Sequence, residues 1–381
     1  MSNSNTRTVI AAPTFNQVKR IYWSGNLNVP DLIPNQFIKN ISHSDHKITL
    51  INDSTIELMS GETPERFEGS FAHLVVLDEC GDLDLQNVLQ RSIYPMVAPT
   101  HGKIYLLGVP RQSMSGFYKE MALKYSDKKK YPNWSCYSWK SADVLDPDEI
   151  ARIKTEIDPL LFQQEFEGIF HSGGGGLAFH QFSKEKHVAP VEYSPGLPLF
   201  VTCDWNTSFM SWNICQIFPN GKVAVLDEVT SRHTNVFTHV PLVKAKLIEI
   251  CGGLDNAKKR GTTFFGDYSG NSNTVASRGS VYQELSNLFA VDRWAHAVKI
   301  KTNPHIDRRV AATNAKLCSA AGVVSIRIDP KCKNLIRDFE LISWADLQRE
   351  KAKLEKQELT HTVDGFSYMI NYFWPLSSVL F

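Results

Sequence analysis

The chain has 381 residues, of which 43% are hydrophobic and 21% are charged, and these proportions exclude wholesale disorder. Its length favours two domains, and its net charge of +1 means that any contact with nucleic acid depends on local basic patches, such as those within 128–130, 258–260 and 299–309. The apolar runs are too short to span a bilayer, and residues 1–8 lack the layout of a signal peptide, so we expect a cytoplasmic protein with no membrane partner. The seven cysteines contain no C-x-x-C pair, which disfavours a zinc site and a disulfide framework.

The first half of the chain alternates short apolar runs with helix-like segments, which is typical of an α/β fold. Asp146 followed by Pro147 marks the start of a helix, and Asp158 followed by Pro159 repeats that signal. We therefore predict an α/β domain that this pair of helices closes. Its expected elements are a strand at 8–12, a helix at 16–23, two strands within 47–59, strands at 73–77 and 103–107, and helices starting at 147 and 159.

Four consecutive glycines at 173–176 interrupt all periodicity and mark a domain boundary. We expect a first domain at 1–170, a glycine-rich linker at 171–195 and a second domain at 196–381. In the second domain, Asn220-Gly221 joins two strand-like runs and predicts a hairpin. Three antiparallel strands followed by alternating helices and strands is an RNase H-like order. The expected elements include strands at 199–203, 262–266 and 323–328, and helices ending at 251, near 281–288, at 308–320 and at 361–374.

Residues 74–77 are apolar and are followed directly by Asp78 and Glu79, which is the form of a Walker B motif. At the end of such a strand the first carboxylate can hold Mg²⁺ on nucleotide phosphates, and the second can polarise the attacking water. The alternative is an ordinary strand followed by an acidic turn. Further along, Gly108-Val109-Pro110 follows a strand, where a γ-phosphate sensor could lie. No G-x-x-x-x-G-K-S/T sequence occurs, so the P-loop is missing and we expect ATP turnover to require it from elsewhere.

Three aspartates stand at the ends of predicted elements in the second domain: Asp204 and Asp267 after strands, and Asp364 in the last helix. In an RNase H-like sheet such carboxylates converge, and two Mg²⁺ or Mn²⁺ ions held by them would bind the attacking water and the leaving 3′ oxygen. His361 lies three residues before Asp364 on the same helix face, so it is a candidate metal ligand or proton shuttle. Glu228 is a candidate fourth carboxylate. The alternative for each aspartate alone is a cap or turn. The pattern predicts a two-metal-ion DNA endonuclease.

The motifs of both halves follow one another along nearly the whole chain: Ala12-Pro13-Thr14 with Gln17, residues 65–69, Leu77-Asp78-Glu79, Gly108-Val109-Pro110, residues 162–166, Asp204, residues 266–270 and residues 360–368. Together they resemble the motifs of the terminase large subunit family of tailed phages. The resemblance implies an incomplete P-loop NTPase-like (ASCE) domain followed by an RNase H-like nuclease domain.

The same resemblance implies a motor that hydrolyses ATP-Mg²⁺ to thread viral DNA into a procapsid, and a nuclease that cuts concatemeric DNA. The implied partners are double-stranded viral DNA, the portal protein, the small terminase subunit and further copies of the chain in a ring. The implied location is the host cytoplasm, at the procapsid portal. Arg66 is a candidate finger toward a neighbouring subunit's nucleotide; the alternative is a surface arginine beside Glu65 and Glu68. Val109 departs from the hydroxyl residue usual at its position in the coupling motif.

The family's P-loop strand and its helix have no counterpart, because only seven residues precede the strand at Thr8. We expect either an upstream fragment that supplies them or a truncated chain. Loss of a central strand would leave a gap in the sheet, so we expect the first half to be unstable alone. Two other interpretations remain open: a recombination or junction-resolving nuclease without motor activity, and a non-catalytic assembly remnant.

Overall fold

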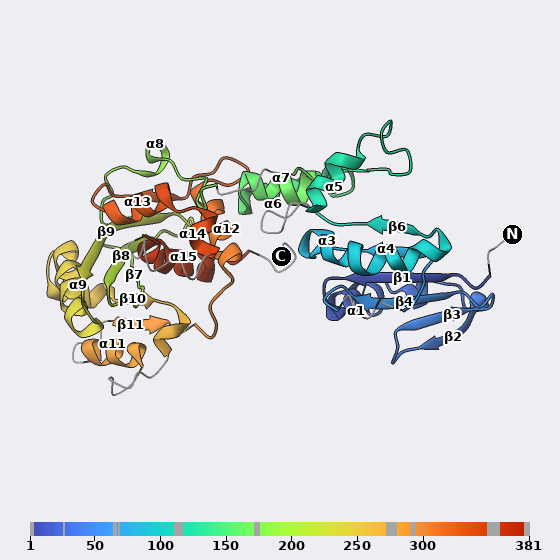
Figure 1. The fold of residues 1–381 in the computed structure, drawn as a ribbon. Helices are drawn as coiled ribbons and strands as arrows, with labels where there is room; N and C mark the ends of the chain where they lie inside the picture. Colours follow the sequence, from blue (N-terminus) through green and yellow to red (C-terminus); the bar gives the residue numbers. More distant parts are fainter. Residues whose placement is uncertain are drawn as a thin grey trace. The chain divides into compact units, whose positions relative to one another are not determined.

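The computed structural model describes residues 4–25, 27–63, 67, 69–109, 117–170, 176–271, 280–290, 295–298, 300–348 and 359–376. The chain forms two compact units, each with its own six-stranded sheet (Figure 1). Unit 1 comprises Met1–Lys140 with Gln164–Gly173, and unit 2 comprises Ser141–Gln163 with Gly174–Phe381. Among the described helices, none combines the length and the apolar composition needed to cross a membrane.

The division between the units differs from the expected boundary after residue 170. Helix α6 (Pro147–Glu156) groups with unit 2, because the amide of Ala320 donates a hydrogen bond to the carbonyl of Ile157 directly after that helix. Part of the expected linker also belongs to unit 2, since Phe179 is buried in its core. Residues 171–175 of that linker lie outside the described residues.

The sheet of unit 1 has the strand order β2-β3-β4-β1-β5-β6. β1 pairs in parallel with β4 on one side and with β5 on the other, and β5 pairs in parallel with β6. Successive side chains of β1 enter two cores on opposite faces: Val9 and Ala11 on one, Ile10 and Ala12 on the other. A strand covered on both faces has a continuous apolar sequence, as predicted here. The strands are β1 (Arg7–Ala12), β2 (Ile38–Ser42), β3 (Lys47–Leu50), β4 (Thr55–Ser60), β5 (Leu74–Leu77) and β6 (Lys103–Leu106).

Helices pack on both faces of this sheet. α1 starts after Thr14, whose hydroxyl caps the first turn in a capping box with Gln17, and its Val18 packs in the core with Ile10. α3, α4 and α5 contribute to the core on the opposite face. The helices are α1 (Phe15–Tyr22), α2 (Val29–Leu32), α3 (Leu85–Val88), α4 (Tyr94–Val97) and α5 (Phe117–Tyr125), with a π-helical turn at Leu89–Ile93 between α3 and α4.

Strand pairing in unit 1 is continuous from β2 to β6, so the expectation of a gap inside this sheet is wrong for the described strands. The unpaired backbone is at the edges instead. The amides of Lys103 and Leu107 donate toward β5, which directs the backbone groups of Ile104 and Leu106 away from it. On the same edge the side chain of Tyr105 is 54% exposed. Among the described residues, β6 is therefore an edge strand beside the end of β5.

The sheet of unit 2 has the order β11-β10-β7-β8-β9-β12. β7, β8 and β9 are antiparallel neighbours, whereas β10, β11 and β12 join in parallel pairs, which agrees with the predicted order of elements. The strands are β7 (Leu199–Thr202), β8 (Phe209–Ile217), β9 (Val223–Arg232), β10 (Thr262–Phe265), β11 (Ala295–Val298) and β12 (Ile326–Ile328).

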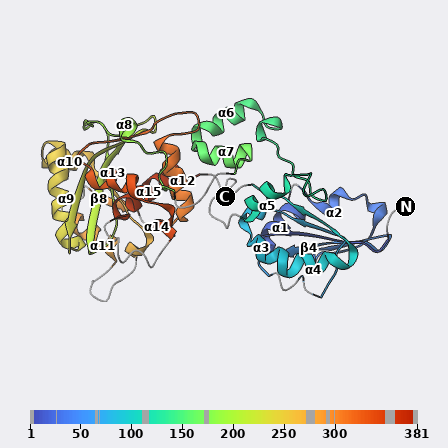
Figure 2. The same ribbon diagram turned by 45° about the horizontal axis from the view of Figure 1, so that its top comes forward.

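Different helices cover the two faces of this second sheet (Figure 2). Phe265 and Val225 pack with α12, α13 and α15, while Val201 and Phe264 pack with α9 and α11. The remaining α-helices of the described residues are α7 (Pro159–Glu167), α8 (Lys184–His187), α9 (Val236–Cys251), α10 (Leu254–Arg260), α11 (Val281–Ala290), α12 (Ile306–Leu317), α13 (Lys333–Leu341), α14 (Trp344–Gln348) and α15 (His361–Phe373).

Candidate functional site

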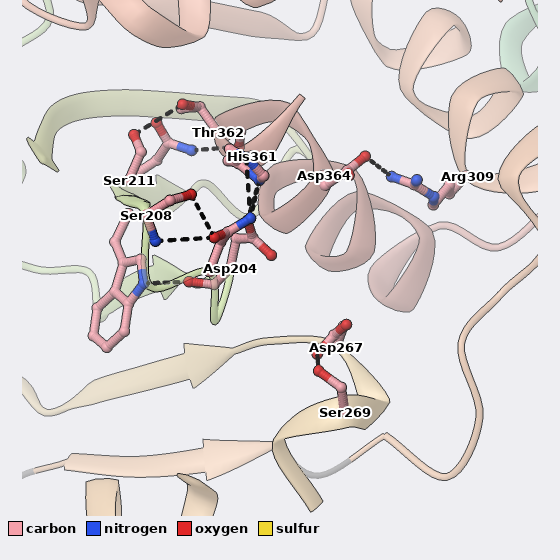
Figure 3. A network of polar contacts seen from close by, with 12 residues as sticks. Asp204, Ser208, Ser211, Asp267, Ser269, Arg309, His361, Thr362 and Asp364 are labelled. Carbon is pink, nitrogen blue, oxygen red and sulfur yellow. Dashed lines mark hydrogen bonds and ion pairs between the residues drawn. The ribbon is translucent and has the colours of Figure 1, made fainter. Parts of the chain in front are cut away.

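Three elements of unit 2 bring acidic side chains to one edge of its sheet. β7 and β10 pair in parallel with Thr202 opposite Phe265, so Asp204 and Asp267 follow neighbouring strand ends at the same level. Asp364 comes from the first turn of α15. Figure 3 shows these aspartates on the three elements. The structure thus brings the three predicted carboxylates to the same end of unit 2.

Gly365 allows α15 to approach β7 this closely. A Cβ at Gly365 would lie 3.0 Å from the carbonyl carbon of Cys203, which is tighter than ordinary packing. Asn213 of β8 ties the same turn to the sheet, because its Nδ2 donates to the carbonyl of Thr362 at 3.1 Å and to the hydroxyl of Thr202 at 3.0 Å. The first turn of α15 is therefore held against the end of β7.

His361 is the direct neighbour of the Asp204 carboxylate. Its Nδ1 lies 2.7 Å from Oδ2 of Asp204, and Nδ2 of Asn206 lies 3.2 Å from its Nε2. The side chain of Asp204 is 19% exposed and that of His361 is 10% exposed. Oδ2 of Asp204 is buried, and the His361 ring lies directly against it. A carboxylate oxygen is the ligand type that a hard divalent cation prefers.

The charges around Asp204 also favour a cation. Burial raises the pKa of Asp204, the neighbouring His361 lowers it, and the carboxylates of Asp364 and Asp267 raise it further. These last contributions mean that the three carboxylates repel one another as anions. A bound Mg²⁺ or Mn²⁺ would relieve that repulsion, so the residues present fit a divalent ion.

The three carboxylates nevertheless do not meet at one point. Within the described part of the chain, no three His, Cys, Asp or Glu side chains lie close enough to hold one ion together. Oδ1 of Asp267 accepts a hydrogen bond from the Ser269 hydroxyl at 2.6 Å, and Oδ1 of Asp364 accepts one from Arg309 at 2.6 Å. Each aspartate thus has its own partner, and the expected single cluster is not formed by the protein alone.

Arg309 is a component of this site that the sequence analysis missed. The residue is 4% exposed, and its Nη1 donates to Asp364 and, at 2.6 Å, to the hydroxyl of Ser367. Its guanidinium lies 4.8 Å from the ring centre of Tyr368. Helical periodicity could have predicted that Arg309 is buried. Ala312 and Thr313, three and four residues later, are buried on the same face of α12.

The structure places the carboxylate of Glu228, the candidate fourth carboxylate, against the start of α13. Its Oε1 accepts hydrogen bonds from the amide and side chain of Asn334, both at 2.8 Å, and its Oε2 accepts one from the amide of Leu335 at 3.1 Å. Burial raises its pKa although these hydrogen bonds lower it. The carboxylate therefore satisfies amides in the first turn of α13, and we assign it to that helix rather than to the acidic site.

The other pair of carboxylates lies in unit 1, directly after β5. Oδ1 of Asp78 accepts the amide of Glu79 at 2.9 Å, and Oδ2 accepts the hydroxyl of Tyr22 at 2.7 Å. Burial and the hydrogen bond to Asp78 raise the pKa of Tyr22. Tyr22 ends α1 and is a second residue that sequence analysis did not identify.

The turn that presents Glu79 is held in a sparsely populated conformation. Glu79 has a φ of 53°, and the amide of the next residue, Cys80, donates to the carbonyl of Leu107 at 2.9 Å. Gly108 closes on this turn with a φ of 147°, and a Cβ there would lie 2.8 Å from the amide nitrogen of Cys80. The end of β6 therefore supports the end of β5. The candidate finger Arg66, and Pro110 of the predicted sensor segment, lie outside the described residues.

No family model matches the sequence, and no curated protein matches it. The large terminase of a thermophilic bacteriophage (crystal form 2) has a similar structure, with a TM-score of 0.56 and 16% identity over 97% of this chain and 87% of that one. The chain has the large terminase fold. The ADP complex of the same phage's terminase gives a TM-score of 0.53 at 15% identity, again over 97% and 87% of the two chains. Its complex with ATP-gamma-S gives 0.51 at 16% identity, over 97% and 86%.

The terminase fold confirms the predicted fold class. It accounts for both six-stranded sheets at once, since the match runs over nearly the whole chain rather than over one unit.

Proposed function

We propose that this chain is the large terminase subunit of a tailed phage, which packages viral DNA and cuts concatemeric DNA with unit 2. The observation that carries the proposal is the acidic edge of unit 2, where a buried oxygen of Asp204 lies 2.7 Å from Nδ1 of His361. Support for the wider role comes from the large terminase fold, which covers 97% of the chain.

For the nuclease we propose that Asp204 and Asp267 hold a divalent ion, Mg²⁺ or Mn²⁺, with Asp364 beside them. When bound, such an ion activates water and stabilises the leaving 3′ oxygen. His361 has Nδ1 against Asp204 and Nε2 near Asn206, so these two side chains orient its ring. We propose that His361 moves a proton during cleavage. The two-ion form of the mechanism remains a prediction.

For the motor we propose that Asp78 contacts the Mg²⁺ of ATP and that Glu79 polarises the attacking water. The hydroxyl of Tyr22 and the amide of Glu79 orient the Asp78 carboxylate for that purpose. We propose that another segment supplies the phosphate-binding P-loop, and that this segment pairs with the open edge of β6. That edge adjoins the turn carrying Glu79. As part of the motor, we also propose that Arg66 reaches the nucleotide bound by a neighbouring subunit.

The partners follow from the same proposal. They are double-stranded viral DNA, the portal protein, the small terminase subunit and further copies of this chain in a ring at the procapsid portal, in the host cytoplasm.

The nuclease proposal is tested by replacing Asp204 with Asn and measuring Mn²⁺-dependent cutting of plasmid DNA. We expect a loss of about 100-fold or more, because the proposed metal ligand and the partner of His361 are both removed. Asp255→Asn is the matched control: it changes the same charge at an exposed position of α10. Cutting by Asp204→Asn at the rate of the control, with an unchanged circular dichroism spectrum, would remove the assignment.

A further inference from the structure

Arg309 places a permanent positive charge inside the acidic site. It comes from α12, whereas the carboxylate that it contacts, Asp364, comes from α15. Both side chains are largely enclosed, at 5% and 15% exposed. A guanidinium remains protonated at any pH that a protein survives, so this charge cannot be removed by titration.

The geometry holds Arg309 in that place. One nitrogen, Nη1, donates to both Asp364 and Ser367, and the guanidinium packs over the ring of Tyr368. Its Nε is buried without a hydrogen-bond partner among the described residues. A buried polar atom without a partner lowers the stability of the fold. The ion pair between Arg309 and Asp364 offsets this cost, and breaking the pair would remove that compensation. The guanidinium is therefore fixed on Asp364.

The ion pair with Arg309 makes Asp364 a weaker ligand for a cation than the other two aspartates. With the charge of Asp364 neutralised by Arg309, a divalent ion bridging Asp364 and Asp204 would have to bind next to a buried cation, and like charges repel strongly where water is excluded. Asp204 and Asp267 differ from Asp364 in their partners, because Asp204 lies against the imidazole of His361 and Asp267 accepts a hydrogen bond from the neutral hydroxyl of Ser269. Two carboxylates and water are a sufficient ligand set for one Mg²⁺.

We propose that Arg309 takes the place of one of the two expected ions, so that this site binds a single divalent ion between Asp204 and Asp267 while Arg309 holds Asp364. The inference rests on the proposed nuclease function. Arg309 is a positioning residue in this scheme: it is too enclosed to reach DNA and acts through the carboxylate that it neutralises. The sequence analysis proposed the basic residues within 299–309 as a DNA contact. Of the two neighbouring arginines in that range, Arg308 is exposed and Arg309 is buried, so only Arg308 has the exposure that such a contact needs.

The test is a Mn²⁺ titration of the full chain, with the free ion followed by electron paramagnetic resonance and the stoichiometry by calorimetry. We expect one ion for the wild type and for Arg309→Lys, which keeps the charge. Arg309→Gln is expected to bind two, because the freed Asp364 becomes a ligand. Arg308→Gln removes the same charge from the neighbouring exposed position and is expected to bind one. Two ions in the wild type, or one in Arg309→Gln, would overturn the inference.

A second variant tests the inference even if Arg309→Gln fails to fold. The double variant Arg309→Gln, Asp364→Asn removes the pair without leaving a lone buried charge. It is expected to keep one ion with an affinity within about threefold of the wild type, since a lost ligand would cost about 10-fold to 100-fold. Loss of that ion would show that Asp364 is a ligand and would contradict the inference. A wild type that binds no ion, even with DNA present, would instead remove the nuclease proposal itself, and this inference with it.

Discussion

The two candidate sites differ in how their carboxylates are brought together. Asp78 and Glu79 are neighbours in sequence, and one strand end presents both. Asp204, Asp267 and Asp364 come from two strands and a helix that are far apart in sequence. A local pair requires only that β5 ends at the right residue, whereas the distributed set requires strand register and helix packing as well. The site of unit 2 should therefore be the easier one to disrupt from a position outside it.

Among positions outside the acidic site, the largest effect on cutting is expected for Gly365→Ala. The added Cβ meets the backbone of Cys203 at 3.0 Å, and a central strand cannot move aside cheaply. We expect Mn²⁺-dependent cutting to fall by about 10-fold, because the backbone must shift by a few tenths of an ångström, which is less than the displacement of about 1 Å that costs about 100-fold. The measurement is a plasmid-cutting rate at saturating Mn²⁺.

Gly196→Ala serves as the control for that substitution, since a Cβ at Gly196 meets nothing within 4 Å. Equal cutting rates for Gly365→Ala and Gly196→Ala would mean that the position of α15 does not matter for the site.

The matching change in unit 1 is Gly108→Ala. It combines a φ of 147° with a contact of 2.8 Å to the Cys80 amide, so we expect unit 1 to lose about 2 to 3 kcal/mol of stability. Hydrogen exchange of β1 and β5 peptides reports this loss. Gly69→Ala, at a φ of 73° with open space around it, isolates the backbone contribution and is expected to cost about 1 kcal/mol. Cutting by unit 2 is expected to be unchanged in Gly108→Ala, and a loss of cutting would contradict this expectation.

Acidification should weaken unit 2 through His239. Burial lowers the pKa of His239 to about 4, and the ring packs against Trp212, whose indole donates to the Asp204 carbonyl. Because the folded pKa lies below the unfolded one of 6.5, the unfolded state binds more protons between these values, and stability falls as the pH is lowered through that window. We expect a loss on the order of 2 kcal/mol between pH 7 and pH 4.5.

Urea unfolding at several pH values measures this dependence. His239→Gln is the comparison, because it removes the titrating group while keeping a side chain that can accept a hydrogen bond from Ser231. A slope of stability against pH that is the same in both proteins would show that His239 is not its source.

The smallest effect is expected for Glu228→Gln. The substitution removes a charge and at least one acceptor from the first turn of α13, so we expect a stability loss of about 1 kcal/mol with unchanged cutting. Asp267→Asn, by contrast, should abolish cutting with little change in stability. If Glu228→Gln also abolished cutting, its assignment to α13 rather than to the acidic site would fail.

Much of the element order was predictable because its signals are local. The apolar run of β1, the Asp146-Pro147 start of α6 and the Asn220-Gly221 turn each depend on residues close in sequence. The strand ends at Asp78 and Asp204 were located for the same reason. The partners Tyr22 and Arg309 were missed because their contacts join helices to distant segments.

The sequence by itself determined which residues end strands and which side chains can carry negative charge there, because strand periodicity and turn chemistry act over a few neighbouring residues. Only the tertiary structure decided what those carboxylates contact. It placed Glu228 at the start of α13, paired Asp364 with Arg309, and set a buried oxygen of Asp204 against the His361 ring. These outcomes depend on sheet register and on the close approach of α15 to β7, which are set by packing between segments far apart in the chain.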